Sequence, residues 1–289
     1  MFEKSHALFR PPAEADSLIL RVADGCPWNG CTFCGMYKGV PYKFHGEKRA
    51  EREFAKAAKR WPEARRIFLA DGDVMNLCFQ SLETMLISLN EKFQQLARVS
   101  LYANGASILA KTDDELRHLK KLKLHTLYMG LESGDNETLR AVNKRESAET
   151  MIEAGLRAQA AGLRMSVMVL IGLAGELRSG QHAKATAAAL NKMQPRLLSA
   201  LRLVTTPNTP LYKSGFKMIT EYDAVAELRG MIRGLELEQT VFRADHSSNI
   251  VPLEARFPKD KERLLTQLDA LLASGALDKN SPGRLPWSL

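Results

Sequence analysis

Runs of apolar residues without strict alternation recur through the first three quarters of the chain. They cover residues 18–22, 66–70, 98–103, 125–130, 165–172 and 197–204. Short runs of this kind are typical of parallel strands that are buried on both faces. Helical periodicity fills several of the intervals, most clearly over residues 79–96. Strands that alternate with helices predict an α/β chain with a parallel sheet and right-handed crossovers.

After the sixth run the pattern changes. We expect a helix over residues 222–237, a polar segment over 242–250 and a last amphipathic helix that begins at Pro258. The chain is therefore predicted to have two parts. Residues 1–215 form a core that includes an N-terminal arm, and residues 216–289 form a C-terminal extension that packs on this core.

The composition is that of a folded globular chain. Of the 289 residues, 45% are hydrophobic and 26% are charged. No apolar run is long enough to cross a bilayer, and the first residues lack the apolar stretch of a signal peptide. We therefore expect a cytoplasmic protein without membrane association. The formal net charge of +8 suits an anionic substrate, an RNA or an acidic electron donor, although a solvated basic surface gives the same total.

Three of the four cysteines, Cys26, Cys31 and Cys34, lie within nine residues in the loop after the first apolar run. Thiolates spaced by four and then two residues can converge on one small metal core, and an odd set of three argues against disulfides. Zinc would need a fourth ligand, which His45 could supply. The spacing favours an iron–sulfur cluster in which one iron lacks a protein thiolate. Cys78 could close such a cluster, but a buried structural cysteine is the role that its place at a helical stripe favours.

Five segments, each at or just after the end of a predicted strand, resemble motifs of the radical S-adenosylmethionine superfamily. They are Cys26–Cys34 with its C-x4-C-x2-C spacing, Leu69–Asp73, Met129–Gly134, Leu170–Glu176 and Leu203–Tyr212. The second departs from the family's Gly-Gly-Glu type of motif, and the fourth has Ala174 where proline is usual. The resemblance implies an α/β fold of the partial (β/α)6 TIM-like barrel type with a C-terminal helical extension. The site is then expected at the C-terminal ends of the strands.

The same resemblance implies two cofactors, a [4Fe–4S] cluster on the three clustered cysteines and S-adenosylmethionine on the open iron. Contacts with S-adenosylmethionine are then expected from Phe33, Asp71, Gly72, Asp73, Glu132, Ser133, Gly172 and Thr206. A low-potential donor of the flavodoxin or ferredoxin type would supply an electron for reductive cleavage. The resulting 5′-deoxyadenosyl radical would abstract hydrogen from a substrate.

The substrate is not encoded in these motifs. The sequence shows no cysteine-rich extension for further clusters and no added RNA-binding module, so we favour a small-molecule substrate over nucleic acid or protein. RNA or protein modification is the alternative among enzymes. A non-catalytic iron–sulfur electron carrier, with Cys78 as fourth ligand, is the alternative outside them. The catalytic candidate is His246 in the run Asp245–Asn249, because an imidazole can relay a proton near neutral pH. We expect His246 and Asn249 near the barrel mouth.

Anaerobically purified protein is expected to carry about four irons and four sulfides per chain, as one such cluster requires. Cys26→Ala, Cys31→Ala or Cys34→Ala removes a ligand and should abolish the cluster, whereas Cys78→Ala should leave it in place. Iron and sulfide assays, together with the visible absorbance of the protein, measure this. Loss of the cluster in Cys78→Ala would contradict the open-iron arrangement.

Overall fold

The computed structural model describes residues 7–285, which form two compact units. The first unit comprises residues 7–29, 34–129 and 154–165, and the second comprises residues 30–33, 130–153 and 166–285. The cysteine loop contributes to both units, because residues 30–33 belong to the second. The predicted boundary at residue 215 stays a prediction.

The elements are named in chain order. The first unit contains η1 (Pro12–Glu14), β1 (Leu18–Arg21), β2 (Ala23–Asp24), β3 (Lys43–Phe44), α1 (Glu47–Arg60), β4 (Arg66–Ala70), η2 (Val74–Asn76), α2 (Phe79–Lys92), β5 (Arg98–Tyr102), α3 (Gly105–Leu109) and α4 (Asp113–Lys121). Three elements contribute residues to both units: β6 (Leu124–Glu132), α6 (Ala148–Ala160) and β7 (Arg164–Ile171). The second unit contains α5 (Asn136–Ala141), α7 (Gly175–Met193), β8 (Leu197–Arg202), α8 (Pro210–Lys213), α9 (Glu221–Gly234), β9 (Val241–Arg243), β10 (Glu254–Arg256) and α10 (Lys261–Ala273).

Parallel strands form the frame of the first unit. β1 pairs with β4, β4 with β5 and β5 with β6, always in parallel register. All six strands predicted from the apolar runs are present, with ends within two residues of the prediction. β4 shows why these runs lack alternation, because residues 67–70 are fully buried and both faces of the strand must be apolar.

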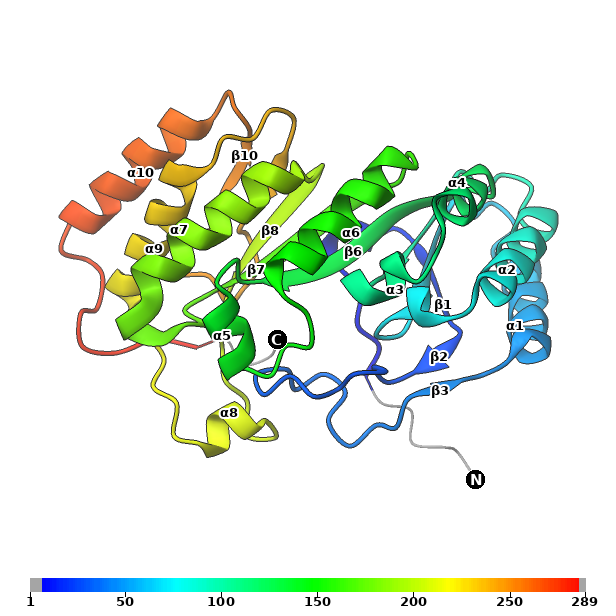
Figure 1. The fold of residues 1–289 in the computed structure, drawn as a ribbon, viewed down its shortest axis with the longest axis horizontal. Coiled ribbons are helices and arrows are strands. Elements are labelled where there is room, and N and C mark those ends of the chain that lie inside the picture. The colour runs from blue at the N-terminus through cyan, green and yellow to red at the C-terminus, as the bar shows by residue number, and fades with distance from the viewer. Residues whose placement is uncertain (1–6, 286–289) are drawn as a thin grey trace. The chain divides into compact units, whose positions relative to one another are not determined.

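Helices α1 and α2 pack against each other in the first unit, where Figure 1 shows them side by side. The apolar stripe predicted over residues 79–96 gives α2 its buried face. Leu82, Met85 and Leu86 are each at most 1% exposed. The helical period therefore identified both the helix and the side that it buries.

In the second unit the sheet continues beyond the predicted sixth strand. β8 pairs in parallel with β7 and with β9, and β9 pairs antiparallel with β10. The polar segment expected over residues 242–250 is therefore wrong at its start, since Val241–Arg243 is a strand with Phe242 fully buried. A strand of three residues is too short to show a period, which is why the sequence pattern missed it.

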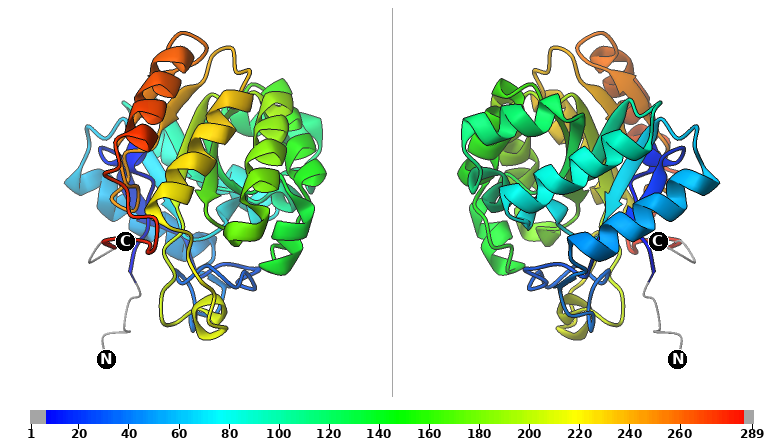
Figure 2. Two further views of the ribbon diagram at one scale, coloured as in Figure 1. Left: turned by 90° about the vertical axis from the view of Figure 1, so that its left-hand side faces the viewer. Right: turned by 90° about the vertical axis from the view of Figure 1, so that its right-hand side faces the viewer.

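The helices of the C-terminal extension pack in a row with α7. Figures 1 and 2 show α7, α9 and α10 side by side, and α9 contacts both of its neighbours. The helix expected over residues 222–237 is α9, and the last helix begins at Lys261 rather than at Pro258. The α7–α9 contact is close, since a Cβ atom at Gly234 would lie 3.0 Å from Ala187 Cβ. In the part of the chain that the structure describes, we find no helix long and apolar enough to cross a membrane.

Candidate functional site

In the first unit, hydrogen bonds from side chains to backbone carbonyl groups stabilise the loop that follows β1. Asn29 Nδ2 donates to the carbonyl oxygen of Tyr37 at 2.7 Å, and Lys38 Nζ donates to the carbonyl oxygen of Asn29 at 2.6 Å. Cys26 and Cys34 of this loop are partly exposed and form no disulfide. The loop therefore has a defined shape that does not depend on disulfide bonds of these cysteines.

Gly72, directly after β4, lies against the same loop. A Cβ atom at Gly72 would be 2.6 Å from the carbonyl oxygen of Gly25 and 2.9 Å from Cys26 Cα. These atoms belong to the backbone and cannot move aside cheaply. Only glycine at this position lets the loop after β4 and the cysteine loop lie in contact.

The two carboxylates beside Gly72 are buried and bonded to protein groups. Asp71 Oδ1 accepts from the Tyr37 hydroxyl at 3.2 Å, and Asp71 Oδ2 lies 3.3 Å from Arg21 Nε. Burial, followed by the negative charge of Asp71, raises the pKa of Tyr37, so its hydroxyl stays a donor. Asp73 Oδ2 accepts from Asn104 Nδ2 and from the hydroxyl of a serine in α3, at 3.0 and 2.6 Å. Both acids therefore shape the loop.

In the second unit, the short segment that contains Cys31 is bonded to the turn after α5. The backbone N–H of Thr32 donates to the carbonyl oxygen of Val142 at 2.9 Å, and Asn143 Nδ2 donates to that of Gly30 at 2.9 Å. Lys144, the next residue of this turn, is close enough for the charge of Cys31 to act on it. The turn therefore carries a buried cation beside one of the three thiols.

Lys144 also binds the motif that follows β6. Its Nζ donates to the carbonyl oxygen of Gly130 at 2.7 Å and lies 3.3 Å from Glu132 Oε1. Burial lowers the pKa of Lys144, but the charges of Glu132, Cys31 and Glu146 outweigh burial and raise it above the ordinary value. Lys144 is therefore a cation that fixes one oxygen of Glu132. Sequence reasoning missed it, because the run A-V-N-K-R resembles an ordinary charged surface.

Ser133 and Gly134 of the same motif face helix α7. The Ser133 Oγ atom lies 2.7 Å from His182 Nδ1, and the Gly134 N–H donates to Thr186 Oγ1 at 2.9 Å. A Cβ atom at Gly134 would lie 2.2 Å from the carbonyl oxygen of Ala185, so the backbone of α7 excludes any side chain there. The motif therefore has two parts. Glu132 pairs with Lys144, and Ser133 and Gly134 pack against α7.

Gly172, directly after β7, has a backbone conformation that favours glycine, with φ +85°. Its N–H donates to Glu227 Oε1 at 2.6 Å. Glu227 is 3% exposed, and burial raises its pKa to about 7. Burial lowers the pKa of His182 to about 4, so its ring is neutral at neutral pH. His182 Nε2 lies 3.5 Å from Glu227 Oε1 and forms no ion pair with it in that state.

Two further predicted contact residues lie in the loops of the second unit. Phe33 packs against a hydrophobic cluster of Val142, Leu173, Leu203 and Leu211. These residues come from the turn after α5, from the segments after β7 and β8, and from α8. Phe33 therefore packs against apolar side chains from several loops of the second unit. The hydroxyl of Thr206, beyond β8, donates to the side-chain oxygen of Asn208 at 2.8 Å and stabilises a turn before α8.

The catalytic candidate His246 is half-buried in a loop with its own hydrogen bonds. His246 Nδ1 accepts from the Ser248 N–H at 3.1 Å and lies 2.8 Å from the Ser248 hydroxyl. Burial lowers the pKa of His246, although the charge of Asp245 opposes this. Asn249 Nδ2 donates to the carbonyl oxygen of Ala200 at 2.9 Å, so this amide extends the β8 ladder where β9 ends. A role for His246 in catalysis stays a prediction.

Two residues considered as extra metal ligands have other surroundings. The buried structural role predicted for Cys78 is wrong, because this cysteine is exposed at the N-cap of α2. It precedes the first turn of the helix and so lies outside the buried stripe. Its sulfur lies 3.3 Å from the Ser81 hydroxyl, and hydrogen bonds from Ser81 to the thiolate lower the pKa of Cys78. His45 Nε2 lies 2.8 Å from Asp24 Oδ2.

Across residues 7–285, we find no three His, Cys, Asp or Glu side chains gathered around a single metal-ion position. A [4Fe–4S] cluster does not need such a gathering, because each thiolate binds a different iron. The chemistry of the donor set fits the cluster: Cys26, Cys31 and Cys34 lie in one glycine-containing loop without a disulfide between them, and iron–sulfur clusters are held by thiolates.

Comparison with known proteins now identifies the class. The profile of the Radical SAM superfamily matches residues 20–179, more than half of the chain. The chain therefore belongs to the radical S-adenosylmethionine superfamily and is an enzyme of that class. The family implies a [4Fe–4S] cluster and S-adenosylmethionine, and reductive cleavage of S-adenosylmethionine is its common chemistry. No curated protein matches the chain significantly.

Solved structures support the fold. Methylornithine synthase (PylB) aligns with a TM-score of 0.55 at 14% identity, over 88% of this chain and 81% of that chain. The FeFe-hydrogenase maturase HydG from Carboxydothermus hydrogenoformans aligns with a TM-score of 0.50 at 22% identity, over 86% and 56%. The radical S-adenosylmethionine methyltransferase TsrM from Kitasatospora setae aligns with a TM-score of 0.56 at 15% identity, over 70% and 41%.

At these identities the likeness shows the fold alone, and it confirms the predicted α/β fold of the TIM-like barrel type. The chain spans only part of several similar structures, as little as 26% of the cobalamin-dependent enzyme OxsB.

Gly72→Ala is expected to lower the iron content of the protein strongly, because the added methyl group would meet the backbone of Gly25 and Cys26 within 3 Å. Gly180→Ala is the matched control, since a Cβ atom there meets nothing within 4 Å and alanine is the better helix former. Iron assays and thermal melts of both variants check this. Normal iron content in Gly72→Ala would contradict the close contact.

Glu227→Gln is expected to gain stability relative to the wild type as the pH rises. The native pKa of about 7 exceeds the ordinary value of 4.5, so folding favours the neutral acid. That contribution is fully present below about pH 4.5 and is lost as the pH rises through about 7, whereas glutamine is neutral throughout. The difference in unfolding free energy should change by about 3 kcal/mol over this window. Denaturant unfolding at several pH values measures it, and a difference independent of pH would contradict the buried acid.

Proposed function

We propose that this enzyme cleaves S-adenosylmethionine at a [4Fe–4S] cluster held by Cys26, Cys31 and Cys34, and abstracts hydrogen from a small-molecule substrate. The observation that carries the proposal is the cysteine loop: three cysteines with the family spacing, whose Gly25–Cys26 segment packs on Gly72 of the next motif. When bound, the cluster supplies the electron that breaks a sulfur–carbon bond of S-adenosylmethionine, and the 5′-deoxyadenosyl group released takes a hydrogen atom from the substrate.

The residues around the loop position the cofactor. The carbonyl groups of Asp71 and Gly72 receive the amino group of the methionine moiety, because those of Ala70 and Asp73 accept from the backbone N–H groups of Val22 and Asn76. The side chains of Asp71 and Asp73 hold that backbone through their bonds to Tyr37 and Asn104. Asp71 and Asp73 thus act in this proposal through the loop that they shape.

Glu132 contacts the ribose or the amino acid portion of S-adenosylmethionine. Lys144 engages Oε1 of Glu132 and leaves Oε2 for a hydroxyl or ammonium donor of the ligand. The side chain of Glu132 is 13% exposed, so an added ligand would find it largely desolvated and its hydrogen bonds correspondingly strong. Ser133 contributes by docking the same turn on α7.

The apolar lining around Phe33 shelters the reaction from water. Gly172 allows the backbone to turn sharply after β7, beside the side chain of Ile219, and Thr206 supplies the polar turn after β8 for the adenine edge. Phe33 packs against the hydrophobic cluster formed by side chains of these loops. A radical step needs such shelter, because water and oxygen would otherwise intercept the intermediate. His246 is the proposed proton relay.

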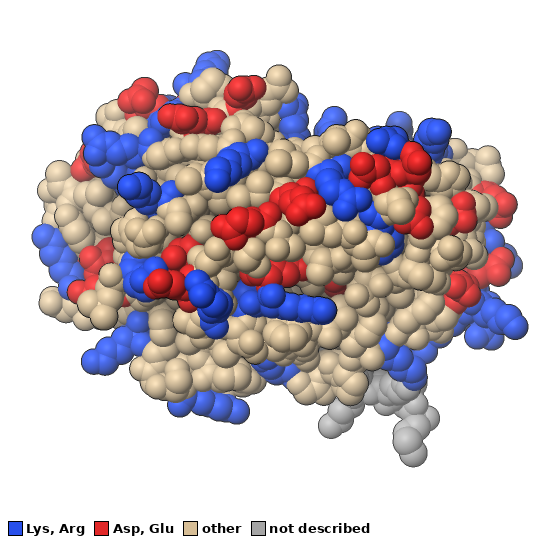
Figure 3. Space-filling view, in the orientation of Figure 1, with Lys and Arg blue, Asp and Glu red and all other residues tan. Residues whose placement is uncertain are grey.

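A low-potential flavodoxin or ferredoxin serves as reductant in this proposal, and the net charge of +8 favours an acidic donor of that kind. On the face shown in Figure 3, lysines and arginines are interspersed with acidic residues rather than gathered in one patch. A mixed surface is compatible with a transient protein partner. The preference for a small-molecule substrate over RNA or protein rests on the sequence argument alone.

Reconstituted protein reduced with dithionite under anaerobic conditions is expected to convert S-adenosylmethionine to 5′-deoxyadenosine, measured by liquid chromatography and mass spectrometry. Glu132→Gln should slow this about 10-fold or more, because it weakens a charged hydrogen bond to the ligand. Cys31→Ala serves as the inactive control and Cys78→Ala as the active one. A full cluster without binding of S-adenosylmethionine would favour an electron carrier, and a stable complex with transfer RNA would favour RNA modification.

A further inference from the structure

A chain of buried polar side chains links the turn after β6 to helix α9 within the second unit. Ser133 Oγ accepts from the Asp135 N–H at 2.9 Å and lies 2.7 Å from His182 Nδ1. His182 Nε2 lies 3.5 Å from Glu227 Oε1, a contact that forms no hydrogen bond. Ser133 and His182 are fully buried and Glu227 is 3% exposed. The turn after β6 is thus connected to α9 through one side chain of α7.

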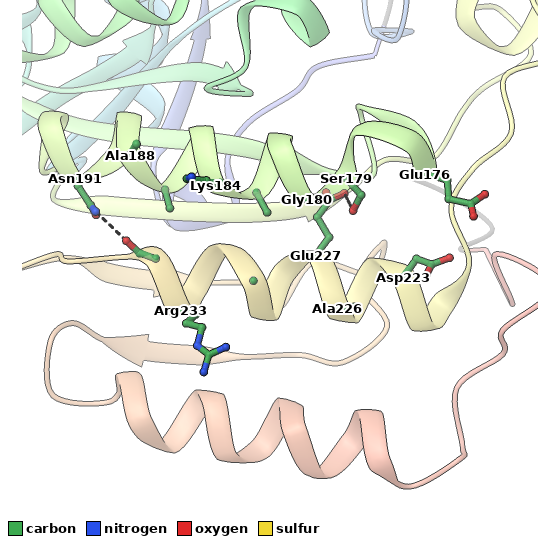
Figure 4. A pocket seen from close by; sticks show the side chains of 14 residues that line it. Glu176, Ser179, Gly180, Lys184, Ala188, Asn191, Asp223, Ala226, Glu227 and Arg233 are labelled. Atoms are coloured by element: carbon green, nitrogen blue, oxygen red, sulfur yellow. Dashed lines mark hydrogen bonds between the residues drawn. The ribbon is translucent and has the colours of Figure 1, made fainter.

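Glu227 holds the turn after β7 directly. Its Oε1 accepts from the Gly172 N–H at 2.6 Å, and its Oε2 accepts from the Ser179 hydroxyl. Figure 4 shows Ser179 on α7 and Glu227 on α9 pointing toward each other. One carboxyl group therefore joins the turn after β7 to two helices.

Packing alone does not account for this carboxyl group. A buried acid destabilises the fold relative to an apolar side chain of similar volume, unless its hydrogen bonds offset the loss of hydration. At Glu227 the hydrogen bonds go to the backbone of one motif loop and to Ser179 of α7, and His182, which is bonded to the other motif loop, only packs against the carboxyl group. The stabilisation that these contacts provide is concentrated on the geometry of these two turns.

We propose that Glu227 is a positioning residue for S-adenosylmethionine, which fixes the Gly172 turn through a hydrogen bond and supports the Glu132–Ser133 turn through its packing contact with His182. The inference rests on the proposed function, because these two turns are its ligand contacts. Because Glu227 lies on α9, the C-terminal extension would contribute to the shape of the S-adenosylmethionine site.

The test compares four variants of the full-length, anaerobically reconstituted protein. Glu227→Met keeps the volume and removes both acceptors, whereas Glu227→Gln keeps a neutral acceptor oxygen. Ser133→Ala removes only the hydroxyl that orients His182. Asp269→Asn is the matched control, because it removes an exposed carboxylate that pairs with Arg229 of α9 at 2.8 Å.

Three quantities are measured for each variant: iron content, the dissociation constant for S-adenosylmethionine, and hydrogen exchange of the peptides that contain Gly172 and Ser133. We expect Glu227→Met to bind S-adenosylmethionine about 10 to 100 times more weakly, the range typical of partners that orient a ligand-binding group. Its iron content should stay normal and the Gly172 peptide should exchange faster. Glu227→Gln should restore affinity to within about threefold, Ser133→Ala should weaken it about 10-fold, and Asp269→Asn should match the wild type.

Wild-type affinity in Glu227→Met would overturn the inference, and so would equal losses in Glu227→Met and Glu227→Gln, because a merely structural role gives no rescue. If Glu227→Met does not fold, wild-type affinity in Ser133→Ala overturns the inference, and a loss of affinity accompanied by faster exchange of the Gly172 peptide in Ser133→Ala supports it. Failure of the wild type itself to bind S-adenosylmethionine would refute the proposed function, and the inference with it. Normal exchange of the Gly172 peptide in Glu227→Met would refute the positioning alone.

Discussion

The backbone contact between Gly72 and the Gly25–Cys26 segment is the constraint on which the cysteine loop depends. Here the backbones of two loops that follow neighbouring parallel strands lie in direct contact. That contact requires a residue without a side chain, and Gly72 meets this condition. The buried pair of Asp71 and Tyr37 then fixes the return of the cysteine loop beyond Cys34. The thiols are thus presented by a loop whose shape is set by packing and by polar bonds within the protein.

A buried ionisable group anchors three of the motif loops to their surroundings. Asp71 serves the cysteine loop, Lys144 the turn after β6, and Glu227 the turn after β7. Inside a protein such bonds are strong because the local dielectric is low, but an unpaired charge there would be costly. Each anchor is therefore a point where a single substitution changes the geometry of a ligand-binding turn while the apolar core stays intact.

Much of the frame could be predicted from the sequence. β4 and α2 are two examples, because burial on both faces gives an unbroken apolar run and burial on one side of a helix gives a period of 3.6. The strand at residues 241–243 was missed because three residues carry no measurable period. The burial predicted for Cys78 was wrong because this residue lies one position before α2. It continues the apolar spacing of the helix in the sequence but lies outside the buried face.

The candidate site divides in the same way. The sequence by itself determined the order of strands, the three clustered cysteines and the membership of the family, because these reside in local spacing and in motifs that follow strands. Only the tertiary structure decided that Ser133 faces His182, that Lys144 fixes Glu132 and that Glu227 reaches Gly172. Gly172 and Glu227 are separated by 55 positions along the chain. No local pattern can encode such a contact, because it depends on how α9 packs against α7 after the chain has folded.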